Sequence, residues 1–250
     1  MKIEIIDLRK SFNGQEVLKG VNLTIHDREL IVIIGRSGVG KSVLLKHLIG
    51  LYRPDSGSIL IEGEDIFKVC YRDVCRLRER FGVLFQGGAL FDSMTVFENV
   101  AFPLQEKTRL SKAEIRQRVD HALEDVGLTG VEDKYPAELS GGMRKRVALA
   151  RALITEPSIV LFDEPTTGLD PISLNSIHRL IIRTHKKYQF TGVVISHDIP
   201  QIFDIADRVA MLHDGRIVEV GLPEEIQRSE NPVVKQFITG SLEGPIKVLQ

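Results

Sequence analysis

Short apolar runs recur along the chain and are separated by segments with the spacing of helices. The runs are rich in Val, Ile and Phe, and they are short enough to be strands buried on both faces. They comprise Leu30–Ile34, Phe81–Phe85, Ile159–Phe162 and Val193–Ile195. Because helical patterns lie between these runs, the sequence predicts an α/β fold with a mostly parallel sheet.

Two hairpins are predicted, one near each end of the chain. The strands and the turn of the first are Ile3 to Leu8, Asn13-Gly14 and Val17–Ile25. Those of the second are Val209–Leu212, Asp214-Gly215 and Ile217–Val220. Asn-Gly and Asp-Gly are the pairs that tight hairpin turns prefer. The first hairpin therefore predicts an antiparallel layer flanking the parallel core.

The segment from about 96 to 155 is helical and poor in strands. Ser111 and Glu114 have the spacing of a capping box, which predicts a helix start at this point. The apolar residues that then repeat on one helix face before Gly127 are Ile115, Val119, Leu123 and Val126. This pattern predicts a helical insertion in the α/β core.

Composition and charge narrow the class of protein. The chain has 250 residues, of which 43% are hydrophobic and 27% charged, with a formal net charge of −1. This suits one large domain, or a core with an inserted subdomain, and the charge offers no broad basic field for nucleic acid. No apolar stretch approaches the roughly 18 residues of a membrane span, and residues 1–4 do not begin a secretory signal. We expect a cytosolic chain that is at most peripheral to a membrane, with Cys70 and Cys75 as reduced thiols.

A glycine-rich motif follows the first buried run. The residues are Gly35, Arg36, Ser37, Gly38, Val39, Gly40, Lys41 and Ser42, and they match G-x-x-x-x-G-K-[ST]. In such a loop backbone N–H groups face an anion, and the start of the following helix adds partial positive charge. Lys41 can then reach the terminal phosphates, and the Ser42 hydroxyl can bind Mg²⁺. The alternative is a glycine turn with an incidental Lys-Ser pair, and the strand before and the helix after favour nucleotide binding.

Two carboxylates follow the run Ile159–Phe162. Ligands in parallel sheets bind at the carboxyl ends of the strands, where Asp163 and Glu164 lie. Asp163 is suited to hold Mg²⁺ through water, and Glu164 to orient or deprotonate a water that attacks a γ-phosphate. A strand that simply ends in solvent is the alternative, which the upstream phosphate loop disfavours.

A second glycine-rich segment precedes the helical run Arg144–Leu153. Ser140 can cap this helix, whose first turn carries Gly141 and Gly142 and so can bind an anion. Together with Leu139 and Met143, these residues resemble L-S-G-G-Q, the signature of the ABC transporter ATPase family. The resemblance extends over nearly the whole chain. It implies a P-loop NTPase (RecA-like) core with an antiparallel β-subdomain and an inserted α-helical subdomain.

Other motifs of that family appear in the expected order. Gln86 matches the Q-loop, Gly168-Leu169-Asp170 the D-loop, and Ser196-His197-Asp198 the switch-histidine segment. Phe12 takes the adenine-stacking position, where the family usually has Tyr, and stacking needs only a flat aromatic face. Met143 replaces the signature glutamine, which removes one polar contact to nucleotide.

The resemblance implies a role for each matching residue. The nucleotide-binding residues would be Phe12, Val17, Gly35, Arg36, Ser37, Gly38, Val39, Gly40, Lys41, Ser42, Val43 and Gln86. The catalytic residues would be Glu164, His197 and Lys41. The Mg²⁺ ligands would be Ser42, Gln86 and Asp163. The residues contributed from a second chain would be Ser140, Gly141, Gly142, Met143 and Asp170.

In this family two ATPase chains pack head to tail around two ATP molecules. The resemblance thus implies a homodimer, with ATP and Mg²⁺ held between one chain's phosphate loop and the other chain's signature helix. It also implies an ATP-binding core of residues 1–95 and 156–225, a helical subdomain of residues 96–155, and a C-terminal extension of residues 226–250. In that extension Val234, Phe237 and Ile238 form a small apolar face that could pack on a neighbouring subunit.

Within the family, the chain looks similar to the ATPase of bacterial systems that move phospholipids between inner and outer membranes with an MCE-domain protein. The segments that carry this closer resemblance are Phe85–Phe91, the Met-containing signature with Arg144 and Arg146, Val234–Gly240, and Glu243–Ile246. It implies integral membrane permease subunits, an MCE-domain partner and a peripheral position at the cytoplasmic face of the inner membrane.

The partner's docking groove is expected between Gln86 and the helical insertion. Residues 87–100 carry aromatic and aliphatic side chains suited to receive a short helix, although some of Leu90, Phe91 and Phe97 would belong to the core. The rival interpretations are an importer ATPase for amino acids or another small solute, and a non-transport ABC ATPase acting on nucleic acid or ribosomes.

Overall fold

The computed structural model describes residues 2–247, so residues 248–250 of the expected C-terminal extension lie outside the described part. The chain divides into two compact units, which are described one at a time. Of the described residues, the first contains 2–79 and 191–247, and the second contains Arg80–Phe190. The functional division expected from the sequence, with a subdomain at 96–155, cuts the chain at other points and stays a prediction.

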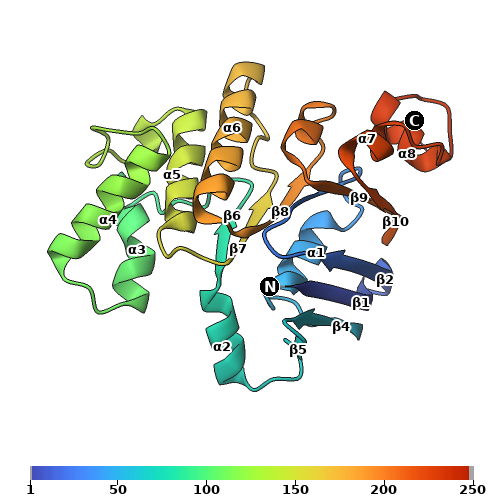
Figure 1. The fold of residues 1–250 in the computed structure, drawn as a ribbon, viewed down its shortest axis with the longest axis horizontal. Coiled ribbons are helices and arrows are strands. Elements are labelled where there is room, and N and C mark those ends of the chain that lie inside the picture. The colour runs from blue at the N-terminus through green and yellow to red at the C-terminus, as the bar shows by residue number, and fades with distance from the viewer. Residues whose placement is uncertain (1, 248–250) are drawn as a thin grey trace. The chain divides into compact units, whose positions relative to one another are not determined.

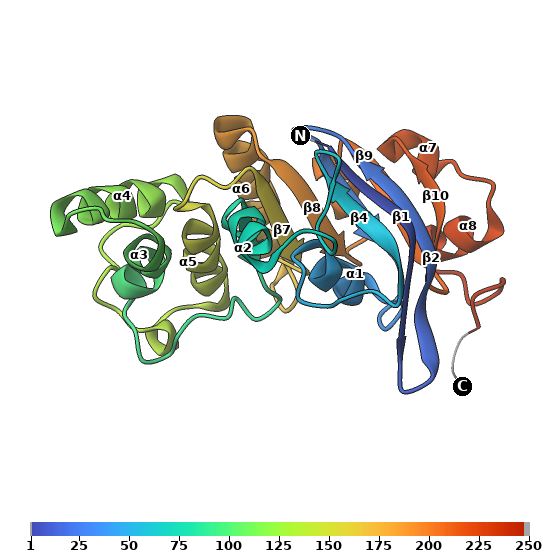
Figure 2. The same cartoon turned by 90° about the horizontal axis from the view of Figure 1, so that it is seen from below.

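An antiparallel sheet forms one part of the first unit, with the strand order β2-β1-β4-β5. Its strands are β1 (Ile3–Phe12), β2 (Gln15–Ile25), β4 (Ser56–Ile61) and β5 (Glu64–Asp65). Figure 2 shows β1 and β2 as a long hairpin. At its turn Asn13 and Gly14 have φ values of 51° and 79°, the left-handed conformations that this turn requires. The predicted first hairpin is therefore confirmed.

A second group of strands in the first unit surrounds β3, which pairs in parallel with β8 and β9. These strands are β3 (Leu30–Ile34), β8 (Thr191–Ser196), β9 (Arg208–His213) and β10 (Arg216–Gly221). Every residue of β3 and β8 is buried, as expected for a parallel strand that is covered on both faces. The β9–β10 hairpin turns at Asp214 and Gly215, as predicted.

The helices of the first unit are α1 (Lys41–Leu48), α2 (Tyr71–Glu79), η2 (Gln201–Ile205), α7 (Pro223–Gln227) and α8 (Pro232–Thr239). Figure 1 shows α7 beside β10, with α8 packed against α7. Val234 on α8 is 0% exposed, so it packs inside its own chain. Of the apolar face expected to meet a neighbouring subunit, only Phe237 and Ile238 remain partly exposed.

The second unit contains a parallel strand pair and a group of helices. The elements are β6 (Phe81–Leu84), α3 (Val96–Lys107), α4 (Lys112–Asp125), η1 (Pro136–Glu138), α5 (Gly141–Leu153), β7 (Ile159–Asp163) and α6 (Pro171–Tyr188). Within residues 96–155 the helices α3, α4 and α5 pack against one another (Figure 1). The predicted capping box is present, because Ser111 Oγ accepts from the Glu114 amide and Glu114 accepts from the Ser111 amide.

Candidate functional site

The phosphate loop leads from β3 into α1 in a conformation that requires glycine. Gly40 precedes α1 at a φ of 104° and has no side chain with which to cap the helix. A Cβ on Gly35 would lie 2.3 Å from the Leu212 carbonyl oxygen, and one on Gly40 would lie 3.0 Å from Val17. The loop is thus pressed between β9 and β2, with an open helix end suited to an anion.

The Lys41 side chain is hydrogen-bonded to the backbone of the phosphate loop. Its residue is 4% exposed, and its ammonium group donates to the carbonyl oxygens of Gly35 at 2.7 Å and Arg36 at 2.9 Å. The ammonium is therefore held against the backbone of the same loop whose amides would face a phosphate. Ser42 and Val43 follow on α1 and are partly buried.

A cavity of about 860 Å³ adjoins the loop within the first unit. Its walls include Val17 and four residues of the phosphate loop, Arg36 to Val39. The C-terminal tail forms part of the wall, because Arg36 Nη1 donates to the Lys247 carbonyl oxygen at 2.7 Å. Phe12 does not belong to this wall. Its ring, 37% exposed, instead packs edge to face with Tyr52, so its adenine-stacking role stays a prediction.

His197 follows the strand next to the one that leads into the phosphate loop. The parallel register pairs Ile34 at the end of β3 with Ser196 at the end of β8. The loop and His197 therefore leave the same edge of the sheet, which is where ligands bind in folds of this type. His197 is exposed, and Ser196 Oγ accepts from the Asp198 amide at 3.0 Å.

In the second unit the predicted catalytic carboxylate lies beside the Q-loop glutamine. Gln86 Nε2 donates to Glu164 Oε2 at 2.9 Å, and Thr167 Oγ1 donates to the same oxygen at 3.0 Å. Asp163, the last residue of β7, is 7% exposed. Glu164 has a φ of 48°, a left-handed conformation that is uncommon for a residue with a side chain. The structure thus brings Gln86, Asp163 and Glu164 together at the end of one strand.

The signature segment begins α5. Ser140 caps the helix by accepting from the Met143 amide at 3.2 Å, as the sequence predicted. A Cβ on Gly141 would lie 3.5 Å from Leu169, and one on Gly142 would lie 3.8 Å from Ser173. The signature and the D-loop are therefore neighbours in this unit.

Asp170 of the D-loop caps α6. Its carboxylate accepts from the amides of Ile172 and Ser173, both at 3.0 Å. The hydrogen bonds from Ser173 and the other groups at this helix start hold the pKa of Asp170 below its usual range. The carboxylate that is predicted to face a second chain is thus fixed in its ionised form at the start of a helix.

Sequence reasoning missed two cations on α5. Lys145, in a residue 7% exposed, donates to the backbone carbonyl of Gln86 and lies 3.4 Å from that of Glu164. Arg151 donates to the carbonyl oxygens of Gly88 at 2.7 Å and Ala89 at 2.8 Å. The sequence did contain a signal for them, because the apolar residues Val147 to Ala150 lie between these two charged positions on the predicted helix.

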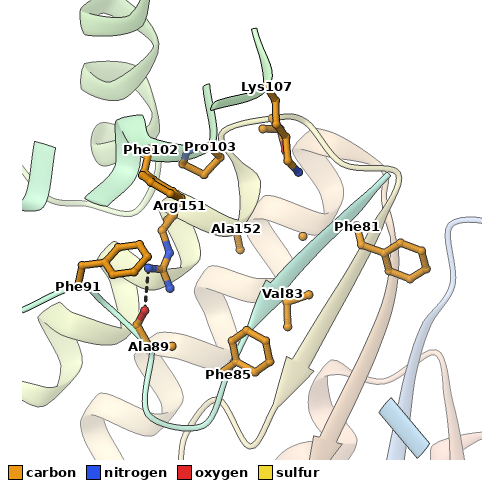
Figure 3. A pocket seen from close by; sticks show the side chains of 12 residues that line it. Phe81, Val83, Phe85, Ala89, Phe91, Phe102, Pro103, Lys107, Arg151 and Ala152 are labelled. Atoms are coloured by element: carbon orange, nitrogen blue, oxygen red, sulfur yellow. Dashed lines mark hydrogen bonds between the residues drawn. The ribbon is translucent and has the colours of Figure 1, made fainter. Parts of the chain in front are cut away.

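A cavity of about 420 Å³ lies where the docking groove was expected. Phe85, Phe91 and Phe102 line it, and Figure 3 shows the Arg151 side chain among them with its hydrogen bond to Ala89. The Arg151 guanidinium lies 5.8 Å from the centre of the Phe91 ring. Other apolar residues of the expected stretch, Val96 and Val100, are fully buried, so they serve the core of the helices. None of the helices within residues 2–247 is long and apolar enough to cross a membrane.

Known proteins resemble this chain along nearly its whole length. The sequence pattern of the family described as "ABC transporter" matches residues 18–167. The "Probable ribonucleotide transport ATP-binding protein mkl" of Mycobacterium tuberculosis is 45% identical over 246 residues, which are 98% of this chain and 68% of that protein. The "Intermembrane phospholipid transport system ATP-binding protein MlaF" of Haemophilus influenzae is 40% identical over 245 residues, which are 98% of this chain and 93% of that protein.

A solved structure gives the same result for the fold. It is the dimeric, post-hydrolysis state of an ATP-binding cassette bound to ADP and Pi, with a TM-score of 0.80 and 31% identity. The match covers 88% of this chain and 98% of that one. The predicted fold class is thereby confirmed.

Proposed function

Because this chain belongs to the ABC transporter family, we propose that it is the ATP-hydrolysing motor subunit of a system that transports phospholipids between bacterial inner and outer membranes. The observation that carries the proposal is the match to an intermembrane phospholipid transport ATP-binding protein, which covers 93% of that protein's length. The Met-containing signature and the segment Phe85–Phe91 agree with it.

The phosphate loop and α1 would bind the triphosphate. Lys41 is the charge that meets the terminal phosphates, after its ammonium leaves the carbonyl oxygens of Gly35 and Arg36. The remaining nucleotide contacts come from the loop amides and from Val17, which already lines the adjoining cavity. Phe12 stacks on the adenine.

The oxygen-rich groups assigned to Mg²⁺ fit that ion, which prefers carboxylate, hydroxyl and amide oxygens. Ser42, Gln86 and Asp163 would hold it, and the hydrogen bond from Gln86 to Glu164 uses the amide nitrogen and not the oxygen. When bound, Mg²⁺ neutralises charge that develops on the phosphates during transfer. Glu164 accepts a proton from the attacking water, and His197 contacts the γ-phosphate.

We propose a homodimer in which each ATP is completed by the partner copy. The solved relative with ADP and Pi is a dimer, and this chain carries both half-sites, the phosphate loop and the signature. In the dimer Ser140 to Met143 of one copy, with Asp170, face the ATP on the other copy. Hydrolysis then cleaves the γ-phosphate that bridges the two copies, and release of phosphate lets the dimer open.

The cavity lined by Phe85, Phe91 and Phe102 is the surface that we assign to a membrane permease subunit. An aromatic groove of this kind receives the apolar face of a short helix. The motor would thereby be held, as a peripheral subunit, at the cytoplasmic face of the inner membrane, and an MCE-domain protein would carry the lipid beyond it.

A second candidate function also has an observation behind it. The mycobacterial relative, 45% identical, carries a name that refers to ribonucleotide transport, which would make the cargo a small solute. To separate the two, the native complex is purified through this subunit, its membrane subunit identified, and ATP hydrolysis measured in liposomes. Stimulation by phospholipid, with an MCE-domain protein in the complex, supports the proposal. Stimulation by nucleosides, nucleotides or amino acids, with no MCE-domain protein, refutes it.

A further inference from the structure

Lys145 is a buried cation in the middle of the second unit. It lies on α5, just after the first turn that carries the signature, and only 7% of the residue is exposed. A buried ammonium group is unfavourable unless hydrogen bonds replace the water that it loses. Its partners are two backbone carbonyl groups, that of Gln86 and, at 3.4 Å, that of Glu164.

These two partners are themselves joined. The side chain of Gln86 donates to the carboxylate of Glu164 at 2.9 Å, while Lys145 contacts the backbones of both residues. The contacts form a closed ring. It runs from the Lys145 ammonium to the Gln86 backbone, from the Gln86 side chain to the Glu164 carboxylate, and from the Glu164 backbone carbonyl back to Lys145. A closed ring fixes an orientation that a single hydrogen bond would leave free to rotate.

The backbone of Glu164 has need of such support. Its φ of 48° is disfavoured for a residue with a side chain, and such conformations persist only where several contacts impose them. Lys145 supplies one of these contacts at the carbonyl group, and Gln86 and Thr167 supply others at the carboxylate.

The Q-loop is held to α5 beyond Gln86 as well. Arg151 binds the carbonyl oxygens of Gly88 and Ala89, so the loop is attached to the signature helix at two places. Lys145 is the one of these two cations that also reaches Glu164. Burial lowers the pKa of Lys145, and the charges of Glu164 and Asp163 oppose that shift.

We propose that Lys145 is a positioning residue for ATP hydrolysis, which sets the carboxylate of Glu164 by holding the backbones of Glu164 and Gln86 to the signature helix. The inference rests on the ATPase activity within the proposed function and does not depend on the cargo. It predicts that loss of Lys145 slows the chemical step and leaves ATP binding nearly intact, because the hydrogen bonds of its ammonium group go to the backbones of Gln86 and Glu164.

The test compares Lys145→Met with Lys187→Met in the full-length protein. Lys187 is an exposed lysine of the same unit that pairs with Asp125, so it controls for the loss of one lysine charge. For Lys145→Met we expect kcat to fall about tenfold to a hundredfold, the effect of a catalytic group displaced by about 1 Å, with ATP affinity changed less than about twofold. Lys145→Arg, which can still donate to both carbonyl groups, recovers part of the rate. Lys187→Met behaves as the wild type.

A double variant separates positioning from a merely structural role. If Lys145 acts through Glu164, then Lys145→Met lowers the residual rate of Glu164→Gln no further, because the two effects are not additive. Independent, multiplicative losses would overturn the proposal, as would a wild-type kcat in Lys145→Met. If that variant does not fold, Lys145→Gln is measured, whose shorter side chain cannot span both carbonyl groups, and an unchanged kcat again overturns it. A wild-type protein that hydrolyses no ATP would contradict the proposed function itself.

Discussion

Gly35 is the residue where a single methyl group should do the most damage to the phosphate loop. A Cβ at this position would lie 2.3 Å from the Leu212 carbonyl oxygen, whereas carbon and oxygen atoms in contact are about 3.3 Å apart. The overlap of about 1 Å must be relieved by moving the loop away from β9. Such overpacking costs about 1–3 kcal/mol. The φ of 151° adds at least about 1 kcal/mol for a residue with a side chain.

For Gly35→Ala we therefore expect the free energy of unfolding to fall by about 2–4 kcal/mol, or on the order of 5–15 °C in Tm for a chain of this size. The matched control is Gly63→Ala. Gly63 has a φ of 85°, and a Cβ added there would meet no atom of the described residues within 4 Å. That variant therefore bears only the cost of a left-handed conformation, about 1–2 kcal/mol. Thermal unfolding of both variants without nucleotide is the assay. Equal shifts in Tm would show that contact with Leu212 does not hold the loop, and the reasoning would fail.

Three further predictions concern the site and the groove. Glu164→Gln should bind ATP but hydrolyse it at least about a hundredfold more slowly, so that it accumulates as a closed dimer in gel filtration. Wild-type turnover would contradict the assignment of Glu164 as the base. Ser140→Arg should abolish hydrolysis and leave ATP affinity of the isolated monomer unchanged, since Ser140 acts on the partner's nucleotide; a direct loss of affinity in the monomer would count against this. Phe91 is 43% exposed, and Phe91→Asp should release the membrane subunit in a pull-down while the basal ATPase rate stays within about twofold of the wild type. Retention of the membrane subunit would show that the groove is not its docking site.

The local structure could be predicted from the sequence where a short segment decides it. Asn13-Gly14 and Asp214-Gly215 form the predicted hairpin turns, and Ser111 forms its capping box, because each depends on neighbours within a few residues. The phosphate loop and the signature helix start were found for the same reason. Their glycines and their caps are local requirements.

Features that depend on distant parts of the chain could not be predicted in this way. In the sequence Lys145 is one more charged position on a helix, and its burial depends on carbonyl groups 59 and 19 residues away. Helical spacing puts Val234 on an apolar face, but it does not reveal which side of α8 the rest of the chain covers.

The start of α1 differs from the starts of five other helices. Side chains cap α3, α4, α5, α6 and α8, whereas Gly40 leaves α1 without one. A side-chain cap contributes about 1 kcal/mol to stability, so the free protein forgoes about that much at α1. A bound phosphate that accepts from the same amides recovers it as affinity. The first turn of α1 should therefore be less stable in the free protein than in the nucleotide-bound protein, so that binding of the substrate also stabilises the fold.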